Sequence, residues 1–321
     1  MPRTHHHLAA VAALALAVFP SSSGAAPEAP KLLEPEKTIL FLGDSITQAG
    51  TYVAYIQTYL WRRYPERNYR LINLGLSSET ASGLTEPDHP YPRPCIHSRL
   101  DRALAQTAPD LTFICYGMND GIYHPPSEQR LAAYRDGITK LIKKVRAVGS
   151  KVVLLTPPPF DAESRRLRGK ELASADAPEF GYKTPFENYD AVLEEFGAWV
   201  MEPRESVELA IDVHTPIEKD ITSRRAADPD YQYGDGVHPN AAGHDIFART
   251  ILAALEAPGL DDLPDLSAPP QGSALAAAMP LILERHKMLS AAWREHVGHD
   301  RPGKAKALPL AEAQARAAAL E

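Results

Sequence analysis

The feature that most constrains the fold is an alternation of short apolar runs with longer amphipathic segments. Strand-like apolar runs cover Thr38–Leu42, Tyr69–Leu74, Leu111–Tyr116, Lys151–Thr156 and Val207–Asp212. Helical spacing of apolar residues covers Thr51–Tyr64, His97–Gln106, Glu128–Val148, Tyr189–Val200 and Ala241–Leu255. Runs that are apolar throughout indicate strands buried on both faces. The alternation therefore predicts a three-layer α/β/α fold around a doubly wound, parallel, five-stranded sheet.

The first 25 residues have the three-part composition of a secretory signal peptide. Arg3 supplies a positive charge, Leu8–Phe19 are apolar, and small residues follow up to Ala25. This apolar run is too short to span a bilayer. We therefore predict that residues 1–25 are a signal peptide and that the chain is exported to the periplasm or secreted. No later segment has 18 consecutive apolar residues, which predicts a mature chain without a membrane span.

The rest of the chain divides by composition into three parts. Residues 26–256 carry the whole alternation and are predicted to form one domain. Residues 257–271 are rich in Pro and Asp and resemble a linker, and residues 272–321 are predicted to be a helical extension with helices at Leu281–Trp293 and Leu310–Leu320. Within the domain, Phe160–Pro185 is charged and irregular, and it is long enough to be a lid or a surface excursion.

Charge and cysteine usage exclude some classes of partner and cofactor. The formal net charge of −7 repels phosphate backbones, so no nucleic-acid partner is predicted. Cys95 and Cys115 lack the Cys-x-x-Cys spacing of a zinc site; we expect Cys115 to be a buried thiol, although an exported protein permits a disulfide. His296 and His299 have a spacing that could hold a metal, but no further strong ligand is indicated and no metal is predicted.

Polar residues follow the predicted strands at points that should meet. Ser45 lies in Gly-Asp-Ser-Ile-Thr after the first strand, and Asn119 lies in Gly-Met-Asn-Asp after the third. A later loop contains Asp-Gly-Val-His-Pro-Asn, with Asp235 and His238. Because the carboxyl ends of parallel strands share one edge of a sheet, all three segments can reach the same site.

These residue types are those of nucleophilic catalysis. A serine hydroxyl such as that of Ser45 becomes reactive only when a base removes its proton and a third group holds that base in one tautomer. His238 can be the base, and Asp235 can accept from its other ring nitrogen. Asn119 and the backbone N–H of Ser45 are candidate donors to an oxyanion. His214, which also ends a strand, is the competing candidate for the base.

The motifs together resemble the sequence blocks of the SGNH hydrolases, also called the GDSL esterase/lipase superfamily. Gly-Asp-Ser-Ile-Thr is similar to the first block, Gly-Met-Asn-Asp to the third and Asp-Gly-Val-His-Pro-Asn to the fifth, while Asn73–Thr80 represents the second. The resemblance covers roughly residues 37–256, so residues 26–256 would be the SGNH hydrolase domain. It implies a flavodoxin-like fold, ester hydrolysis through an acyl-enzyme, and no metal or organic cofactor.

The resemblance also implies roles for individual residues. Ser45 would be the nucleophile, Asp235 and His238 the rest of the triad, and Asn119 an oxyanion donor. In the second block the family commonly has a glycine whose backbone N–H donates to the oxyanion. The register of this chain places Ser78 at that position, and Gly75 is the alternative.

The substrate is predicted from the loops around this site. The proline-rich segment Thr85–Pro94 is either a rigid connector or a wall of the substrate pocket. In the second case Arg93 would meet a polar or acidic substrate group, and His124 would also line the pocket. We expect hydrolysis of short acyl esters, acetyl esters in particular, on small molecules or carbohydrate. The alternatives are a lipase or thioesterase that takes longer acyl chains and a carbohydrate-binding module without activity.

Overall fold

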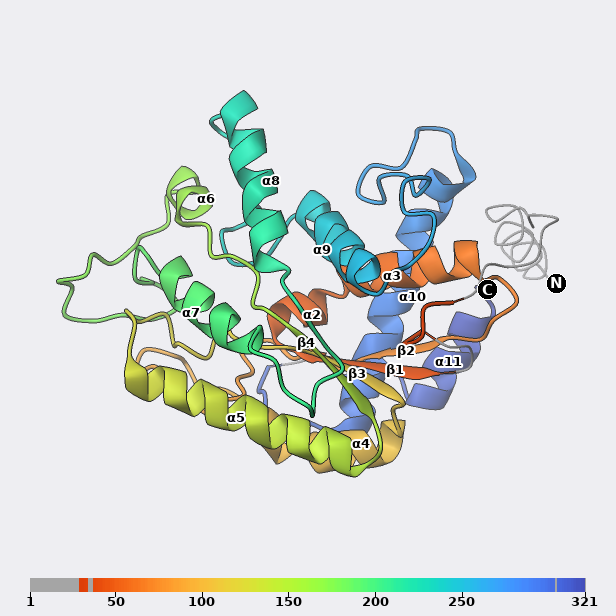
Figure 1. Cartoon of the computed structure of the whole chain (residues 1–321), viewed down its shortest axis with the longest axis horizontal. Helices are drawn as coiled ribbons and strands as arrows, with labels where there is room; N and C mark the ends of the chain where they lie inside the picture. The colour runs from red at the N-terminus through yellow and green to blue at the C-terminus, as the bar shows by residue number, and fades with distance from the viewer. Residues whose placement is uncertain (1–28, 34–36, 304, 321) are drawn as a thin grey trace, which may run out of the picture.

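A computed structural model describes residues 29–33, 37–303 and 305–320 of the chain (Figure 1). The predicted signal peptide, residues 1–25, lies outside these residues. Within the described part of the chain, no helix combines the length and the hydrophobicity needed to cross a membrane.

Five parallel strands form the central sheet, in the order β2-β1-β3-β4-β5. The strands are β1 (Thr38–Gly43), β2 (Arg70–Asn73), β3 (Leu111–Cys115), β4 (Lys151–Leu155) and β5 (Leu209–Ile211). All five predicted strands are confirmed, with ends shifted by one or two residues. The order of the strands reverses direction between β1 and β3, so a crevice is expected at their carboxyl ends.

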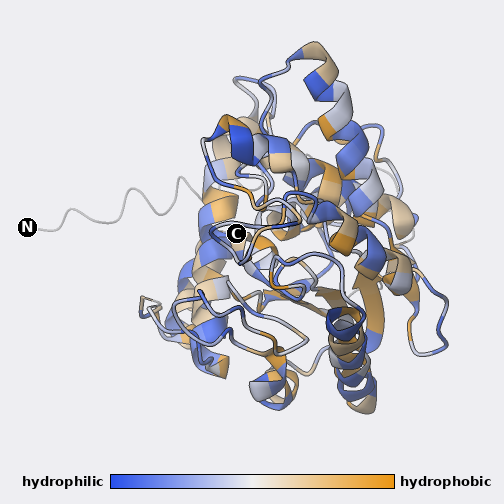
Figure 2. Ribbon diagram, turned by 90° about the vertical axis from the view of Figure 1, so that its left-hand side faces the viewer, coloured by the Kyte–Doolittle hydropathy of each residue, from blue (hydrophilic) through white to orange (hydrophobic). Residues whose placement is uncertain are grey.

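Helices cover both faces of the sheet, as the alternation predicted (Figure 1). One face carries α3 (Thr51–Arg63), α8 (His214–Ala227) and α9 (Ala241–Ala254), and the other carries α4 (Leu100–Thr107), α5 (Glu128–Ala147) and α7 (Asp190–Val200). In Figure 2 the hydrophobic colouring is concentrated in the sheet, and hydrophilic residues lie on the outer sides of the helices. The three-layer α/β/α fold is therefore confirmed.

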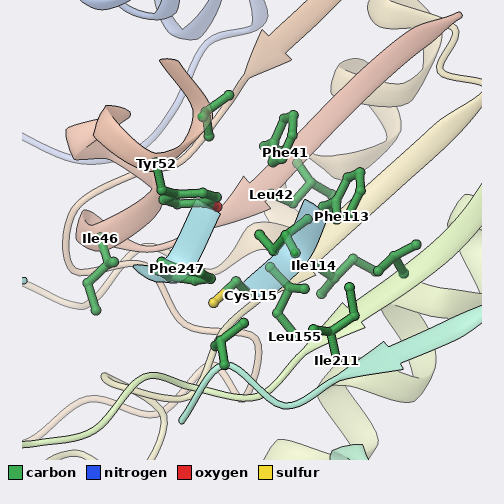
Figure 3. Close-up of a cluster of buried hydrophobic side chains, with 14 of the residues drawn as sticks. Phe41, Leu42, Ile46, Tyr52, Phe113, Ile114, Cys115, Leu155, Ile211 and Phe247 are labelled. Atoms are coloured by element: carbon green, nitrogen blue, oxygen red, sulfur yellow. The ribbon is translucent and has the colours of Figure 1, made fainter. Parts of the chain in front are cut away.

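Aromatic rings pack within the sheet, between two of the helices that cover it, and across the two layers (Figure 3). The rings of Phe41 on β1 and Phe113 on β3 stack with their centroids 4.9 Å apart. The rings of Tyr52 on α3 and Phe247 on α9 stack at 4.2 Å. Burial of each such side chain stabilises the fold by about 1.5–3 kcal/mol. The ring of Tyr52 also meets that of Phe41 edge-on at 6.1 Å, which packs α3 against β1, the strand that leads into the Ser45 turn.

Three features of the helices differ from the expectation. Neither α8 nor the short α6 (Ala162–Leu167) was predicted. The last long helix, α10 (Ala274–Val297), begins seven residues before the expected Leu281 because Pro280 is accommodated inside it. In α8 only three side chains are buried, so its sequence lacks the apolar stripe by which a helix is recognised.

The C-terminal extension packs against the domain. Helix α10 contacts α3, α4 and β2, and α11 (Leu310–Ala318) packs on α10. The predicted linker, residues 257–271, is pinned to α9, because Arg249 donates hydrogen bonds to the carbonyls of Leu260, Leu263 and Pro264. The extension therefore adds a layer over the β2 edge of the sheet.

Candidate active site

Ser45, His238 and Asp235 meet at the carboxyl edge of the sheet. Ser45 is the first residue of the short helix α2 (Ser45–Ala49), directly after β1. Its Oγ is 2.8 Å from His238 Nε2, and His238 Nδ1 is 2.9 Å from Asp235 Oδ2. Residues 193 positions apart in the chain thus form one continuous line of hydrogen bonds. This is the arrangement in which an imidazole can deprotonate a hydroxyl.

The turn from Asp235 to His238 is rigid. The second carboxylate oxygen of Asp235 accepts hydrogen bonds from the backbone N–H groups of Val237 (2.9 Å) and His238 (2.7 Å). Gly236 adopts a φ of 89°, and a Cβ there would lie 2.5 Å from the carbonyl oxygen of Asp161. Glycine is therefore required for the turn to close on its neighbour. Both carboxylate oxygens of Asp235 are used, so the orientation of the imidazole is determined.

The protonation states within this pair follow from the same contacts. Burial opposes ionisation of Asp235, but the hydrogen bonds and charge of His238 and the backbone amides outweigh it and hold the pKa of Asp235 below its ordinary value. Burial likewise opposes protonation of His238, but the hydrogen bond and charge of Asp235 prevail, and the pKa of His238 is raised. A carboxylate that stays ionised beside a more basic imidazole suits general-base catalysis near neutral pH.

Asp44, the residue before Ser45, supports the turn. It is 3% exposed, and its carboxylate caps α2 by accepting the backbone N–H of Ile46 at 2.9 Å. Burial raises the pKa of Asp44 to about 7. When ionised, Asp44 adds to the negative charge that raises the pKa of His238. Asp44 thus has a structural role and an electrostatic effect on the candidate base.

The candidate oxyanion donors lie on the loops after β2 and β3. Asn119 is 3% exposed, and one hydrogen of its amide is donated to the carbonyl of Glu79 at 3.1 Å, which leaves the other available. Ser78 has a φ of 68°, and its backbone N–H has no acceptor among the described residues. The N–H of Gly75 donates to Asn73 Oδ1 at 2.8 Å. This geometry favours Ser78 over Gly75 as a backbone donor.

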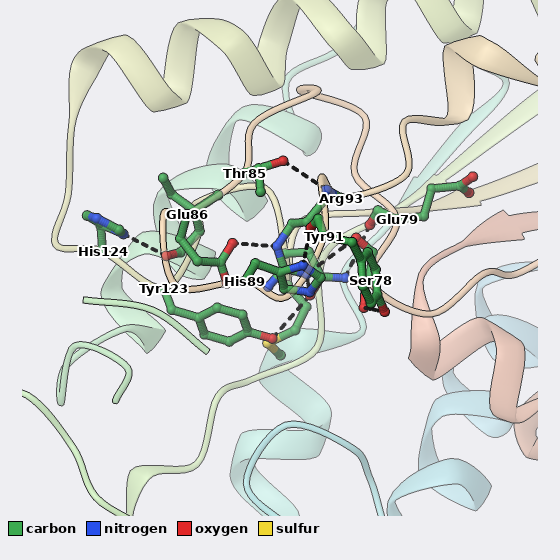
Figure 4. Close-up of polar contacts among 12 residues, drawn as sticks. Ser78, Glu79, Thr85, Glu86, His89, Tyr91, Arg93, Tyr123 and His124 are labelled. Carbon is green, nitrogen blue, oxygen red and sulfur yellow. Dashed lines mark hydrogen bonds and ion pairs between the residues drawn. The ribbon is translucent and has the colours of Figure 1, made fainter. Parts of the chain in front are cut away.

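Arg93 is buried, so it is not placed to meet a substrate group, as it would be if the proline-rich segment were a pocket wall. Its side chain is 2% exposed and forms a bidentate ion pair with Glu86, at 2.6 and 2.5 Å (Figure 4). Its remaining nitrogen donates to Asn119 Oδ1 at 2.9 Å and to the carbonyl of Ser78 at 3.3 Å. A buried guanidinium attracts every available acceptor, because an unsatisfied buried charge is costly. The proline-rich loop therefore folds its cation inward.

Two residues of the hydrogen-bond network around Arg93 and Asn119 were not predicted from the sequence. Glu86 pairs with Arg93, and the hydroxyl of Tyr123 donates to Asn119 Oδ1 at 3.2 Å. Opposite charges at positions 86 and 93 of one proline-rich loop were the available signal for the pair. Nothing local marks Tyr123, since its contact depends on the path of the loop after β3.

A surface pocket lies beside these loops. Its volume is about 410 Å³, and its lining comprises Pro87, Asp88, His124, Pro178, Glu179, Phe180 and Thr184. The rings of His124 and Phe180 are 5.5 Å apart. Nearby, the ring of His89 contacts Tyr91 at 4.6 Å and Tyr182 at 5.3 Å, and the hydroxyl of Tyr91 is 3.5 Å from Ser78 Oγ. A series of contacts thus runs from Ser78 through Tyr91 and His89 to Tyr182, and the pocket itself is lined by both polar and apolar side chains.

The described residues bring one group of possible metal ligands together. Asp190, Glu194 and His214 have ligand atoms within 4.8 Å of one another. His214 Nδ1 contacts the carbonyl of Pro157 at 3.1 Å, and its Nε2 is 3.4 Å from Asp190 Oδ2. Burial opposes protonation of His214, but the hydrogen bond and charge of Asp190 outweigh it and raise its pKa. His214, the competing candidate for the base, therefore has partners other than Ser45.

Neither cysteine forms a disulfide. Cys95 is half-buried and Cys115 is buried, and both are free thiols. Burial raises the pKa of Cys115 well above its ordinary value, so it remains a neutral thiol in the core, as expected.

Comparison with known proteins gives a family and a set of structural neighbours. The model of the GDSL-like lipase/acylhydrolase family matches residues 41–246, from β1 into α9. An acetylxylan esterase of Geobacillus stearothermophilus is 25% identical over 235 residues, which are 67% of this chain and 91% of that protein. The C-terminal extension lies outside the family match.

Two solved structures share the fold. A gut microbial diltiazem-metabolizing enzyme has a TM-score of 0.55 and 21% identity, over 72% of this chain and 48% of that chain, so this chain spans about half of its length. A catalytic mutant of an acetylxylan esterase from Geobacillus stearothermophilus has a TM-score of 0.50 and 20% identity, over 70% of this chain and 96% of that chain.

Proposed function

The chain belongs to the GDSL-like lipase/acylhydrolase family and is a carboxylic ester hydrolase, and we propose that Ser45 is its nucleophile, His238 its general base and Asp235 the residue that orients the base. The observation that carries this proposal is the line of hydrogen bonds from Ser45 Oγ through His238 to Asp235, at 2.8 and 2.9 Å. No rearrangement is needed for the first proton transfer, because the heavy atoms are already within hydrogen-bond range.

The reaction proceeds in two halves. Ser45 Oγ attacks the ester carbonyl carbon while His238 Nε2 takes its proton, and the new oxyanion accepts hydrogen bonds from Asn119 Nδ2 and the backbone N–H groups of Ser78 and Ser45. His238 then returns the proton to the departing alkoxide, which leaves as the alcohol, and the acyl group stays bonded to Ser45 Oγ as an acyl-serine. Water, deprotonated by His238, attacks the acyl group, and collapse of the second intermediate releases the acid and restores Ser45.

We propose acetyl or other short acyl esters on carbohydrate as the substrates. The acetylxylan esterase relative supports this class. The pocket lined by Asp88, His124 and Phe180 supports it as well, because sugars bind through ring stacking and hydrogen bonds. A lipase is less well supported. In the described part of the chain, the large hydrophobic side chains that are exposed are Val148 and Met201, and these do not form an apolar surface at the site.

We also propose that residues 1–25 direct export and are removed. The support is the sequence of this segment, with its positive start, apolar centre and small residues. Expression of the full chain in a bacterial host, followed by fractionation and N-terminal sequencing, tests this proposal. A mature protein that starts near Ala26 in the periplasm or medium is expected. An intact N-terminus in the cytoplasm would contradict it.

Activity is tested with chromogenic esters of increasing acyl length and with acetylated xylo-oligosaccharides. Wild type is expected to prefer acetyl esters, and Ser45→Ala is expected to lose about three or more powers of ten in kcat/KM. Phe180→Ala should raise KM for the acetylated oligosaccharide and leave 4-nitrophenyl acetate unchanged. Labelling by a fluorophosphonate probe separates an enzyme from a binding module, since an unreactive Ser45 in folded protein would favour the latter.

A further inference from the structure

Arg93 connects the two loops that carry the candidate oxyanion donors. It lies on the proline-rich loop, and one guanidinium nitrogen, Nη1, donates both to the side chain of Asn119 and to the carbonyl of Ser78, at 2.9 and 3.3 Å (Figure 4). The other two nitrogens are held by Glu86, whose side chain is 0% exposed. The backbone N–H of Arg93 donates to Thr85 Oγ1 at 2.9 Å, which ties both ends of the loop together.

The charge of Arg93 determines which way the Asn119 amide points. A guanidinium has only donors, and the hydroxyl of Tyr123 donates to the same Asn119 oxygen at 3.2 Å. The oxygen end of the amide must therefore face Arg93 and Tyr123, and the NH₂ end must face the other way. There it meets the carbonyl of Glu79 at 3.1 Å, with its second hydrogen unused. In the reversed orientation the NH₂ group of Asn119 would face the N–H groups of Arg93, and no hydrogen bond could form between them.

The hydrogen bond from Arg93 to the carbonyl of Ser78 is made to a residue with a strained backbone conformation. Ser78 has a φ of 68°, in the left-handed region that non-glycine residues seldom adopt. A hydrogen bond to its carbonyl helps to hold that conformation, and with it the direction of the neighbouring N–H groups. One cation thus restrains a side-chain amide and a backbone segment on two separate loops.

We propose that Arg93, held by Glu86, is a positioning residue of the oxyanion hole, which aims the donors of Asn119 and Ser78 at the charge that develops during ester hydrolysis. This inference rests on the proposed function of the site. Arg93 itself does not touch substrate, because its side chain is 2% exposed and every guanidinium nitrogen has a protein partner. Its effect is therefore expected in the transition state and not in substrate binding.

A double-mutant cycle with Asn119 tests the proposal. The pair Glu86→Gln/Arg93→Gln removes both charges together, so that neither is left buried alone. With 4-nitrophenyl acetate, Asn119→Ala is expected to lower kcat about 10²–10³-fold. The paired variant should lower kcat about 10–100-fold with KM within about twofold. In the Asn119→Ala background the paired change should lower kcat by less than about tenfold and by a smaller factor than in the wild-type background, because one of the two donors it orients is absent and only Ser78 remains.

Several outcomes would overturn the proposal. A paired variant that lowers kcat by the same factor with and without Asn119 would show a general structural role. A raised KM with unchanged kcat would show that Arg93 binds substrate. If the paired variant does not fold, as judged by circular dichroism, Arg93→Lys is used in the same cycle, since it keeps the charge beside Glu86 and loses the fork that reaches both loops. Unchanged kcat in folded Arg93→Lys would equally contradict the proposal.

Two control variants distinguish a positioning role of Arg93 from a general loss of stability and from failure of the proposed function. Arg249→Gln removes an arginine that ties residues 260–264 to α9; it should lower the Tm, and its effect on kcat should be the same with and without Asn119. Ser45→Ala reports on the reaction itself. If Ser45→Ala keeps full activity, the proposed function fails. If it is inactive and the cycle is additive, only the role of Arg93 fails.

Discussion

His286 on α10 accepts a hydrogen bond from the side-chain amide of Asn73, at the end of β2, over 3.2 Å. The same amide donates to the carbonyl of Thr47 on α2 at 2.6 Å, and its oxygen accepts the N–H of Gly75 at 2.8 Å. Burial, with the charges of neighbouring arginines, lowers the pKa of His286 to about 3, so the ring is neutral, and Nε2 is the acceptor because the amide nitrogen of Asn73 can only donate. The C-terminal extension therefore touches the residue that joins the Ser45 helix to the second-block loop.

A chain that ends at Gly272 is expected not to fold cooperatively. It lacks α10, which buries Leu275, Met279, Ile282 and Trp293. At about 1.5–3 kcal/mol for each side chain, their sum is comparable to the whole stability of a typical domain, about 5–15 kcal/mol. Circular dichroism melts and esterase assays check this. A chain that ends at Gly303 loses only α11 and is the control, expected to stay folded with a lower Tm. Native-like melting of the shorter chain would contradict the prediction.

Asp235→Asn is expected to lower kcat by about three to four powers of ten with little change in Tm. Asparagine keeps an oxygen for the backbone N–H groups of Val237 and His238, so the turn is retained. Its NH₂ group, however, would face Nδ1 of His238 and leave the proton on Nε2, toward Ser45. Asp230→Asn, an exposed change on the same loop, is the control. A loss of kcat of less than tenfold in steady-state kinetics of Asp235→Asn would exclude the proposed role of Asp235 in orienting His238.

Asp44→Asn is expected to shift the acid limb of the pH profile of kcat/KM to lower pH. The ionised Asp44 raises the pKa of His238, so removal of that charge lowers the pKa of the base. Asparagine keeps the cap on Ile46, and the turn should persist. Asp101→Asn, exposed on α4, should leave the profile in place. An unchanged acid limb in folded Asp44→Asn would refute the electrostatic effect.

The same substitution tests the stability linkage of Asp44. Its pKa in the folded protein, about 7, is above the ordinary 3.8 because of burial. The folded state therefore binds the proton more tightly, and the wild-type protein loses stability as pH rises from about 4 to 7. The Tm of Asp44→Asn should equal or approach that of wild type near pH 4 and exceed it by a margin that grows up to pH 7. A constant difference across this range would contradict the linkage.

Gly75→Ala is expected to lower both Tm and kcat. A Cβ at Gly75 would overlap the backbone of Thr47 and Gln48 on α2, so either the loop or the Ser45 helix must move. Overpacking of this kind costs about 1–3 kcal/mol. Gly197→Ala in α7 is the control, since its Cβ would meet Thr156 at an ordinary 3.5 Å and alanine favours helix. A Gly75→Ala variant with wild-type Tm and kcat would show that the close approach has no consequence.

The sheet could be predicted because its signals are local. The run Leu111–Cys115 is apolar apart from Thr112, and all five of its residues are buried in β3. Helix α8 could not be predicted in the same way, since most of its residues face solvent and Pro216 near its start is typical of a turn. Pro280 likewise obscured the first turns of α10. In these segments tertiary packing, and not local periodicity, maintains the helix.

The sequence by itself determined the parallel sheet and the polar segments after β1 and β3, because strand direction brings Ser45 and Asn119 to one edge whatever the loops do. Only the tertiary structure brought His238, which follows α8 and a loop, to the same edge. Only the tertiary structure decided that Arg93 turns inward to Glu86 and Asn119. Only the tertiary structure decided that His286 meets Asn73, 213 residues away. The physical reason is that such contacts depend on where irregular loops and a docked helix bury their polar groups, and no short-range pattern encodes that outcome.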